Sequence, residues 1–395
     1  MWERMALPEV LNFREGPGIL AKDFRSAGVP LIRLAGLKGR SVVEGCNFLD
    51  AADVTKRWSQ FRLRMGDALL STSASLGEVA VVDPAGAGAV PYTGIISFRP
   101  KDSRVASNFI PWMLKEQSFK HQIEAMGVGS VMKHFGPSHL RHMSVTVPPR
   151  PEQEAIAEVL GALDDKIAAN TALAATAEQL LRAEIDAMWL TSEDRSSMLS
   201  DFVELNPKMA IRRGASAVYI DMKRLPETGW SINGHDYREP KGGARFQNGD
   251  TLLARITPCL ENRKTGFVDR LQHGQVGIGS TEFIVLRPRD GVAAPIPFLL
   301  ATAPRFRDHA IQHMVGTSGR QRVAASDLAS FEMPKPEPQW LADFSSRAVA
   351  IFEATAVQAT ENSTLAETRD ALLPQLMSGK LRVRDAHAAA SEAGA

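Results

Sequence analysis

The amino-acid sequence predicts an α+β protein in which two pseudo-repeated mixed α/β domains are each followed by one long helix. Three observations support this prediction. Sequence blocks recur with a period of about 190 residues, which is typical of duplicated domains; strand-like runs alternate with amphipathic stretches; and a heptad pattern follows each mixed part. The predicted segments are a mixed domain at 1–149, a central helix at 150–190, a second mixed domain at 191–336, a C-terminal helix at 337–383 and a disordered tail at 384–395.

The composition is that of a globular chain and excludes several classes of protein. Of 395 residues, 44% are hydrophobic and 23% are charged, which rules out a wholly disordered chain and a collagen. Two cysteines, Cys46 and Cys259, cannot form a disulfide framework and are expected to be small buried side chains. The uncharged windows are short and interrupted by Pro and Gly, and the N-terminus does not resemble a secretory signal, so we expect a cytoplasmic protein.

The net charge of +1 predicts no global attraction to nucleic acid or to a membrane. Any contact with DNA would therefore come from local patches of basic and polar side chains.

Internal repetition organises the chain. The blocks recur in the same order in both halves and include a Gly-Asp-x-Leu-Leu element and an Arg-Pro-x-Asp element. The clearest pairs are RMGDALLSTS from Arg64 with QNGDTLLARI from Gln247, ISFRPKD from Ile96 with IVLRPRD from Ile284, and NTALAATAEQLL from Asn170 with NSTLAETRDALL from Asn362. The same fold is therefore expected twice.

Each mixed part combines short strands with helices. Strand-like runs bounded by Gly, Pro and Asp occur at 79–82, 95–98, 144–147, 218–220 and 283–286. Amphipathic stretches near 108–126 and 296–314 are predicted to be helical. This alternation favours a mixed domain over an all-α or all-β one.

Each second part is predicted to be one long helix with a coiled-coil seam. Apolar residues follow alternating steps of four and three from Ile156 to Met188, and more weakly from Ala348 to Leu373. Asn170 and Asn362 take corresponding seam positions, where a polar residue can fix the register of a helix pair. The alternative is a pair of ordinary core helices whose asparagines face water.

Signatures of catalysis and metal binding are absent from the sequence. It contains no phosphate-binding loop, no dinucleotide fingerprint, no HExxH, no CxxC and no Asn/Asp-Pro-Pro-Tyr/Phe tetrapeptide of amino-methyltransferases. His134, His139 and His142 lie close together but lack Cys or acidic partners, so we interpret them as basic loop residues. We therefore expect no catalytic residue, no metal site and no cofactor in this chain.

Four glycine-punctuated loops carry hydrogen-bond donors and are the candidate DNA-contacting segments. Arg, Lys, Ser, Thr and Asn side chains bind phosphate oxygens and base edges, and glycines allow close backbone approach. The alternative is that these loops are merely solvated surface. The candidate residues are Ser71, Thr72, Ser73, Lys133, His134, Arg141, Arg255, Thr257, Asn262, Arg263, Lys264, Arg320 and Arg322.

The order of these features resembles the specificity subunit of a type I DNA restriction-modification system. The first helical signature is PPRPEQEAIAEVLGALDDKIAAN from Pro148, and the second is RDALLPQLMSGKLRV from Arg369. The Gly-Asp elements fit the family pattern, and the resemblance covers residues 2–383. One departure is that the second Pro-Glu-Gln is replaced by Glu-Pro-Gln at 337–339.

The resemblance implies a non-catalytic DNA-binding subunit. Each mixed domain would be a target-recognition domain that reads one half of a bipartite, asymmetric sequence in double-stranded DNA. The long helices would pack antiparallel as a coiled coil, set the unread spacer and dock two modification subunits. Those methyltransferase subunits would carry S-adenosylmethionine, and restriction subunits with motor and nuclease activity would join them. No membrane partner is implied.

Two other classes of function are weighed against this one. A single-chain restriction and methylation enzyme, or a fragment of one, predicts a cofactor loop and a catalytic tetrapeptide, which the sequence lacks. A coiled-coil scaffold that binds no DNA predicts the helix pair alone. Gel shift of the chain, alone and with a modification subunit, distinguishes these classes.

Overall fold

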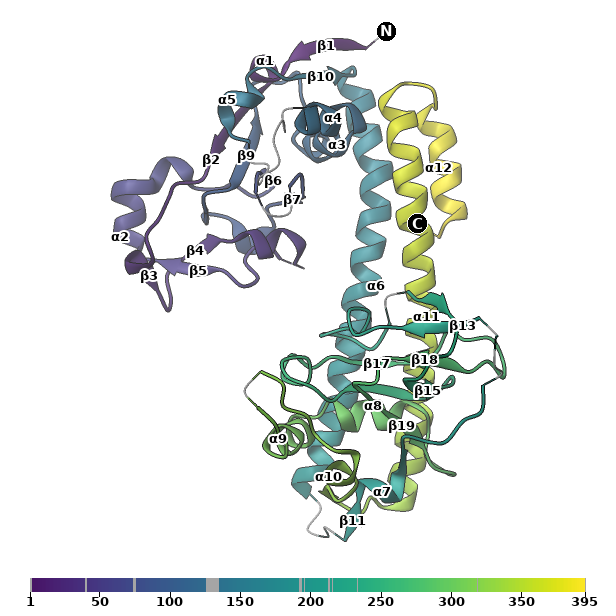
Figure 1. Ribbon diagram of the computed structural model, residues 1–395. Coiled ribbons are helices and arrows are strands. Elements are labelled where there is room, and N and C mark those ends of the chain that lie inside the picture. The colour runs from purple at the N-terminus through teal and green to yellow at the C-terminus, as the bar shows by residue number, and fades with distance from the viewer. Residues whose placement is uncertain are drawn as a thin grey trace. The chain divides into compact units, whose positions relative to one another are not determined.

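The computed structural model describes residues 2–39, 41–73, 76–125, 135–191, 194, 196–211, 214, 216–232, 234–317 and 319–394. The chain divides into two compact units (Figure 1). Unit 1 comprises Met1–Ala168 and Glu361–Ala395, and unit 2 comprises Ala169–Thr360. Two long helices, α6 (Arg150–Thr191) and α11 (Pro338–Met377), each contribute to both units.

Unit 1 contains three sheets. A two-stranded sheet pairs β1 (Glu3–Ala6) with β10 (Ser144–Val147). The first four-stranded sheet has the order β2 (Leu11–Glu15), β9 (Ile95–Pro100), β6 (Ala68–Ser71) and β7 (Val79–Val81). The second has the order β3 (Phe24–Arg25), β5 (Asn47–Leu49), β4 (Val29–Ile32) and β8 (Val90–Pro91). Its short helices are α1 (Leu7–Val10), α2 (Ala51–Asp53), α3 (Ile110–Lys115), α4 (Gln117–Ala125) and α5 (Pro137–Leu140).

Unit 2 repeats this set of sheets. The two-stranded sheet pairs β11 (Ser197–Met198) with β20 (Glu332–Met333). One four-stranded sheet has the order β12 (Val203–Leu205), β19 (Phe283–Pro288), β16 (Thr251–Ala254) and β17 (Thr265–Phe267). The other has the order β14 (Asp236–Arg238), β13 (Ala217–Ile220), β18 (Gly277–Gly279) and β15 (Ala244–Phe246). Its short helices are α7 (Leu199–Phe202), α8 (Pro295–Ala301), α9 (Pro304–Gln312) and α10 (Ala325–Ala329).

The repeated sheets share their pairing and differ at one edge. In unit 1, β4 is antiparallel to β5 and parallel to β8, and in unit 2, β13 is antiparallel to β14 and parallel to β18. The fourth strand differs, because β3 pairs with β5 in unit 1 whereas β15 pairs with β18 in unit 2. Every predicted strand run falls in a strand, and the α+β prediction with two pseudo-repeated parts is confirmed.

A buried ion pair explains why the Gly-Asp and Arg-Pro elements occur in both repeats. Asp67 precedes β6, is 5% exposed, and binds the Arg99 guanidinium of β9 at 2.5 Å. In unit 2, Asp250 is 1% exposed and binds Arg287 of β19 at 2.6 Å. Each carboxylate also accepts a backbone N–H from its own turn, from Arg64 or Gln247. The pair therefore joins the turn to the neighbouring strand.

The long helices pack antiparallel within each unit. In unit 1, Asp164 of α6 forms an ion pair with Arg369 of α11, and Leu163 and Leu365 are buried in one core. In unit 2, the seam position Glu184 pairs with Arg347, beside buried Ile185. The prediction of two long antiparallel helices is confirmed.

The sheets of unit 2 pack on α11 through aromatic rings. The Phe352 ring of α11 stacks on Trp230 with ring centroids 4.2 Å apart and meets Phe267 of β17 edge-on at 5.0 Å. Such contacts add to the free energy of burying these large side chains. The sheets of unit 2 are therefore held on the α11 segment that belongs to the same unit.

The C-terminal tail was expected to be disordered, and this expectation is wrong. Residues Val383–Glu392 form helix α12, and Ala386 and Ala390 are buried in the core of unit 1. Alanine is the strongest helix former, and apolar residues at Val383, Ala386, Ala390 and Ala393 follow helical spacing. Helix α11 ends at Met377 rather than near residue 383, and Gly379, with φ 69°, follows its end in the left-handed conformation that commonly terminates helices.

Other expectations differ in detail from the structure. The amphipathic stretch 108–126 is split between α3 and α4, and the stretch 296–314 between α8 and α9. Pro304 begins α9, because proline lacks the N–H that would continue the preceding helix. Cys46 and Cys259 are half-buried rather than buried, and burial raises the pKa of the Cys46 thiol. Among the described residues, no helix has the length and apolar character of a membrane span.

Candidate nucleic-acid interface

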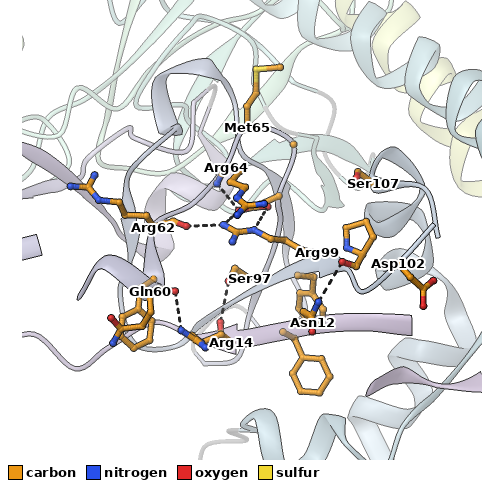
Figure 2. Close-up of a pocket in the computed structure, with 16 residues that line it drawn as sticks. Asn12, Arg14, Gln60, Arg62, Arg64, Met65, Ser97, Arg99, Asp102 and Ser107 are labelled. Atoms are coloured by element: carbon orange, nitrogen blue, oxygen red, sulfur yellow. Dashed lines mark hydrogen bonds and ion pairs between the residues drawn. The ribbon is translucent and has the colours of Figure 1, made fainter. Parts of the chain in front are cut away.

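Unit 1 contains an arginine-lined cavity of about 670 Å³ beside β2 and β9 (Figure 2). Residues of β2 alternate between the two faces of the sheet, so that Arg14 is exposed and pairs with Ser97 across the ladder. Arg99 comes from β9, and the turn that precedes β6 contributes Arg62 and Arg64. Four guanidinium groups from three segments thus line one concave surface.

Three of these arginines retain an uncompensated charge. The Arg99 guanidinium binds Asp67, but Arg14 Nη1 donates to the Gln60 carbonyl at 2.9 Å and Arg62 Nη1 to the Gly88 carbonyl at 3.0 Å. A carbonyl oxygen orients a guanidinium without neutralising it. In the part of the chain that the structure describes, no carboxylate forms an ion pair with Arg14, Arg62 or Arg64. The cavity is therefore electropositive.

Unit 2 carries a second cavity, of about 590 Å³, whose lining includes residues equivalent to some of those that line the first. Leu11 pairs with Pro100 in unit 1 and Val203 pairs with Pro288 in unit 2, so Arg14 corresponds to Asn206. Asn206 and Val285 exchange hydrogen bonds of 2.8 and 3.0 Å, and the equivalent residues Arg14 and Ser97 pair across the ladder in unit 1. The basic residues that line this cavity are Lys208, Arg245 and Arg255.

One arginine position lines both cavities. Arg62 and Arg245 both lie four residues before the glycine of the Gly-Asp turn. The residue that follows each of them, Leu63 or Phe246, is buried. This alternation fixes the arginine on the opposite, cavity-lining face.

The structure brings two of the predicted loops together in unit 2. The backbone N–H of Thr257 donates to the Gln321 carbonyl at 3.0 Å, and that of Val323 donates to the Arg255 carbonyl at 3.0 Å. Glu282 lies between the side chains of Arg255 and Arg322. The Arg322 guanidinium holds the pKa of the Glu282 carboxyl below its ordinary value. These residues form one cluster at the edge of the second cavity.

Four predicted contact residues point inward. Ser71 and Thr72 are buried, and Ser71 Oγ accepts the Glu78 N–H at 2.9 Å. Arg263 Nη2 binds Glu178 of α6 at 2.7 Å, and Lys264 Nζ donates to the Met222 carbonyl at 3.2 Å. These bonds hold the chain together within each unit, so these four side chains do not face a ligand on the surface.

The remaining predicted residues differ in accessibility. Arg141, Asn262 and Arg320 are exposed, whereas Ser73 and Thr257 are half-buried. Lys133 and His134 lie outside the described residues. Asn170 is buried and Asn362 is half-buried, and because they belong to different units, their register role stays a prediction.

Sequence reasoning missed the arginines that line the cavities. Arg62 and Arg64 stand just before the Gly-Asp element, and Arg14 follows an apolar strand run. The recurrence of arginine four residues before Gly66 and Gly249 was a detectable signal. Among the described residues, no cluster of three His, Cys, Asp or Glu side chains is arranged to hold a metal ion.

Comparison with known proteins agrees with the sequence resemblance. Residues 1–179 match the family described as type I restriction modification DNA specificity domain. The chain is 29% identical over 148 residues to the type I restriction enzyme EcoAI specificity subunit of Escherichia coli, which covers 36% of this chain and 25% of that one. The chain thus spans about a quarter of the length of the Escherichia coli relatives that it matches.

Two further similarities extend along the whole chain. The putative type I restriction enzyme MjaX specificity subunit of Methanocaldococcus jannaschii is 19% identical over 409 residues, which covers 97% of this chain and 94% of that one. The crystal structure of the type I restriction-modification system S subunit from M. genitalium superposes with a TM-score of 0.59 at 14% identity. It covers 95% of this chain and 96% of that one, and this likeness shows a shared fold.

Proposed function

We propose, on the premise that residues 1–179 form a type I restriction-modification DNA specificity domain, that this chain is a DNA specificity subunit. In this proposal each unit reads one half of a bipartite, asymmetric target in double-stranded DNA. The chain itself is not an enzyme. It directs partner subunits that modify or cut the DNA.

The repeated arginine-lined cavity is the observation that carries this proposal. Arg62, in the turn before β6, and Arg245, in β15, stand at the same sequence position before the Gly-Asp element and line cavities of about 670 and 590 Å³. Arginine binds phosphate oxygens through charge and guanine through a bidentate hydrogen bond, so one residue type serves both affinity and specificity. Two such surfaces in one chain fit a target with two separate halves.

The sequence differences between the cavities fit two different half-sites. Arg14 of the first cavity corresponds to Asn206 of the second, whereas Arg64 of the first cavity corresponds to Gln247, which lies outside the lining of the second. Arginine side chains favour guanine, whereas Asn and Gln side chains favour adenine. We propose that the residues around a shared arginine decide which bases each unit prefers.

The helix pair supplies a candidate ruler and a docking surface. Helix α6 spans Arg150–Thr191 and belongs to unit 1 over its first part and to unit 2 over its second part. We propose that α6 and α11 set the length of the unread spacer, with Asn170 and Asn362 fixing their register. Two modification subunits would dock on the helices and their flanks.

Cofactor and catalysis are assigned to the partners. In this proposal S-adenosylmethionine is bound by the modification subunits, and restriction subunits supply the motor and nuclease. A near-neutral chain suits this division, because partner subunits can supply phosphate contacts that a net charge of +1 does not.

Methylome sequencing of the host, with and without this gene, tests the proposed function. We expect one bipartite, asymmetric methylated motif to disappear on deletion and to return on complementation. An unchanged methylome in a host that expresses the matching modification subunit contradicts the proposal. Gel shift of the purified chain with that subunit on the same motif provides the biochemical check.

A further inference from the structure

Glu282 is the acidic residue in the cluster that it forms with Arg255 and Arg322 in unit 2. It lies in the connection between β18 and β19, and its side chain is 25% exposed. Its carboxylate accepts two hydrogen bonds of 2.8 Å from Arg322, one from Nε and one from Nη2, and it lies 3.5 Å from Arg255 Nε. One carboxylate therefore serves two arginines.

The backbone holds this arrangement in place. The Arg255 N–H donates to the Glu282 carbonyl at 3.0 Å, and Val315 and Arg322 exchange backbone hydrogen bonds of 2.9 and 3.0 Å. The three side chains thus come from three segments that are bonded to one another. A bidentate Arg–carboxylate pair is among the stronger polar contacts in proteins and uses the edge of the guanidinium that phosphate or guanine would otherwise occupy.

Unit 1 has no acidic residue at the position of Glu282, although the Glu15 carboxylate lies beside that position and accepts the Gly94 N–H at 3.1 Å. Ser71 pairs with Ile95 and Ala254 pairs with Phe283, so that Gly94 occupies the position of Glu282, and Thr72 that of Arg255. Three of the four cavity arginines of unit 1, Arg14, Arg62 and Arg64, form no ion pair among the described residues, whereas two basic residues of unit 2 share one carboxylate. The two units therefore differ in how strongly they attract any phosphate.

We propose that Glu282 is a specificity-determining residue that suppresses sequence-independent DNA binding by unit 2. This inference rests on the proposed function. The carboxylate repels phosphates and occupies the bidentate edge of Arg322, so random backbone contact gains little there. A matching base sequence offers directional acceptors in the groove that compete for the same donors. Specificity then arises partly from a penalty on the wrong partner.

The test compares three substitutions in the full-length chain bound to its modification subunit. Binding to a duplex with the methylated motif and to a scrambled duplex is measured over a salt series. The salt slope is the slope of the logarithm of affinity against the logarithm of salt concentration. With Glu282→Gln, this slope on scrambled DNA should steepen by about one to two, because up to two arginines become free to bind phosphates. The ratio of specific to scrambled affinity should fall several-fold.

Two further variants serve as control and as second test. Asp308→Asn removes an exposed carboxylate of α9 and should leave slope and ratio unchanged. Arg322→Gln should weaken binding to the motif about tenfold. On scrambled DNA it should change the salt slope by less than about half of the change that the loss of one phosphate contact causes. It also keeps the proposal testable if Glu282→Gln does not fold, as judged by circular dichroism.

Several results would contradict the proposal. The role of Glu282 is overturned if Glu282→Gln changes neither the salt slope nor the ratio of specific to scrambled affinity. It is also overturned if Arg322→Gln changes the salt slope on scrambled DNA by the amount expected for one lost phosphate contact. If the wild-type complex does not prefer its motif, the proposed function fails instead. Heparin elution then still tests the charge pairing, because Glu282→Gln must elute at higher salt than Asp308→Asn, and equal elution overturns it.

Discussion

Arg62 and Arg64 illustrate how two neighbouring arginines are used differently in the first cavity. Arg62 Nη1 donates to the Gly88 carbonyl, which orients the guanidinium, and its counterpart in unit 2 is Arg245. Arg64 is exposed, corresponds to Gln247, and has no ion pair within the described residues. The first is suited to a contact that both units make, and the second to a contact of unit 1 alone.

At this scale we predict the effect of Arg64→Gln on DNA binding. The substitution removes one exposed charge from the cavity and no internal hydrogen bond of the Arg64 side chain that the structure records. The salt slope of binding should become shallower by about one, and affinity should fall for specific and scrambled duplexes together. Lys380→Gln removes an exposed charge outside the recognition sheets and should leave the slope unchanged. Equal slopes for wild type and Arg64→Gln would remove Arg64 from the interface.

A loop pattern in the sequence indicates exposure but not contact. Arg141, Asn262 and Arg320 lie exposed on loops, and their contact with DNA stays a prediction. Ser71 and Thr72 are buried instead, because their burial depends on the register of β6 against β9, which are separated along the chain. Arg263 likewise faces Glu178, a helix residue whose proximity no local pattern reveals.

The start of α6 is fixed by a buried glutamine that belongs to the family signature. Gln153 is fully buried, accepts the Ala106 N–H at 2.8 Å and donates to the carbonyls of Arg104 and Pro148 at 2.8 and 2.7 Å. It therefore ties the helix to the loop that follows β9. In the second repeat Gln339 is exposed and bonds only Asp343, four residues along its own helix, among the described contacts.

This contrast provides a matched pair of variants at the scale of the element. Gln153→Ala should lower the free energy of unfolding by about 3 kcal/mol, because it leaves buried backbone groups without partners. Gln339→Ala should change it by less than about 0.5 kcal/mol. Urea titration of the full chain measures both. Equal effects would show that the buried glutamine does not anchor the helix.

Elements were predictable where a periodic pattern was long. The seam from Ile156 to Met188 identified α6, whereas the weaker seam of α11 did not identify its end at Met377. Helix α12 was not predicted, because the composition of an alanine-rich tail reveals neither the helical spacing of its apolar residues nor the core against which they pack. The core of unit 1 provides the surface on which so weakly apolar a helix can pack.

At the scale of the whole molecule, duplication was evident from sequence, whereas sheet pairing was not. Repeated blocks locate equivalent strands, but the pairing of β3 in one repeat and β15 in the other depends on contacts between distant segments. The cavities are formed from such segments, which explains why their arginines were not found as a group.

The proposed ruler predicts the effect of changing helix length. Four residues inserted after Ala169 lengthen α6 by about 6 Å and nearly preserve its seam. Duplex DNA rises about 3.4 Å per base pair, so the unread spacer should lengthen by one or two base pairs with both half-sites unchanged. Methylated-site sequencing measures the spacer directly.

A two-residue insertion at the same place serves as the control. It rotates the seam by about 200°, so the helices should unpack and modification should be lost. An unchanged spacer in an active four-residue variant would show that these helices do not measure DNA.

The central claim is that each unit reads its own half-site, and a domain exchange tests it most directly. Residues 191–336 are replaced by the corresponding domain of a relative with a different target, and the hybrid is expressed with its modification subunit. Sequencing of the methylated sites should show one half-site replaced and the other retained at the same spacer length. A change in both half-sites, or retention of both in an active hybrid, would contradict the account.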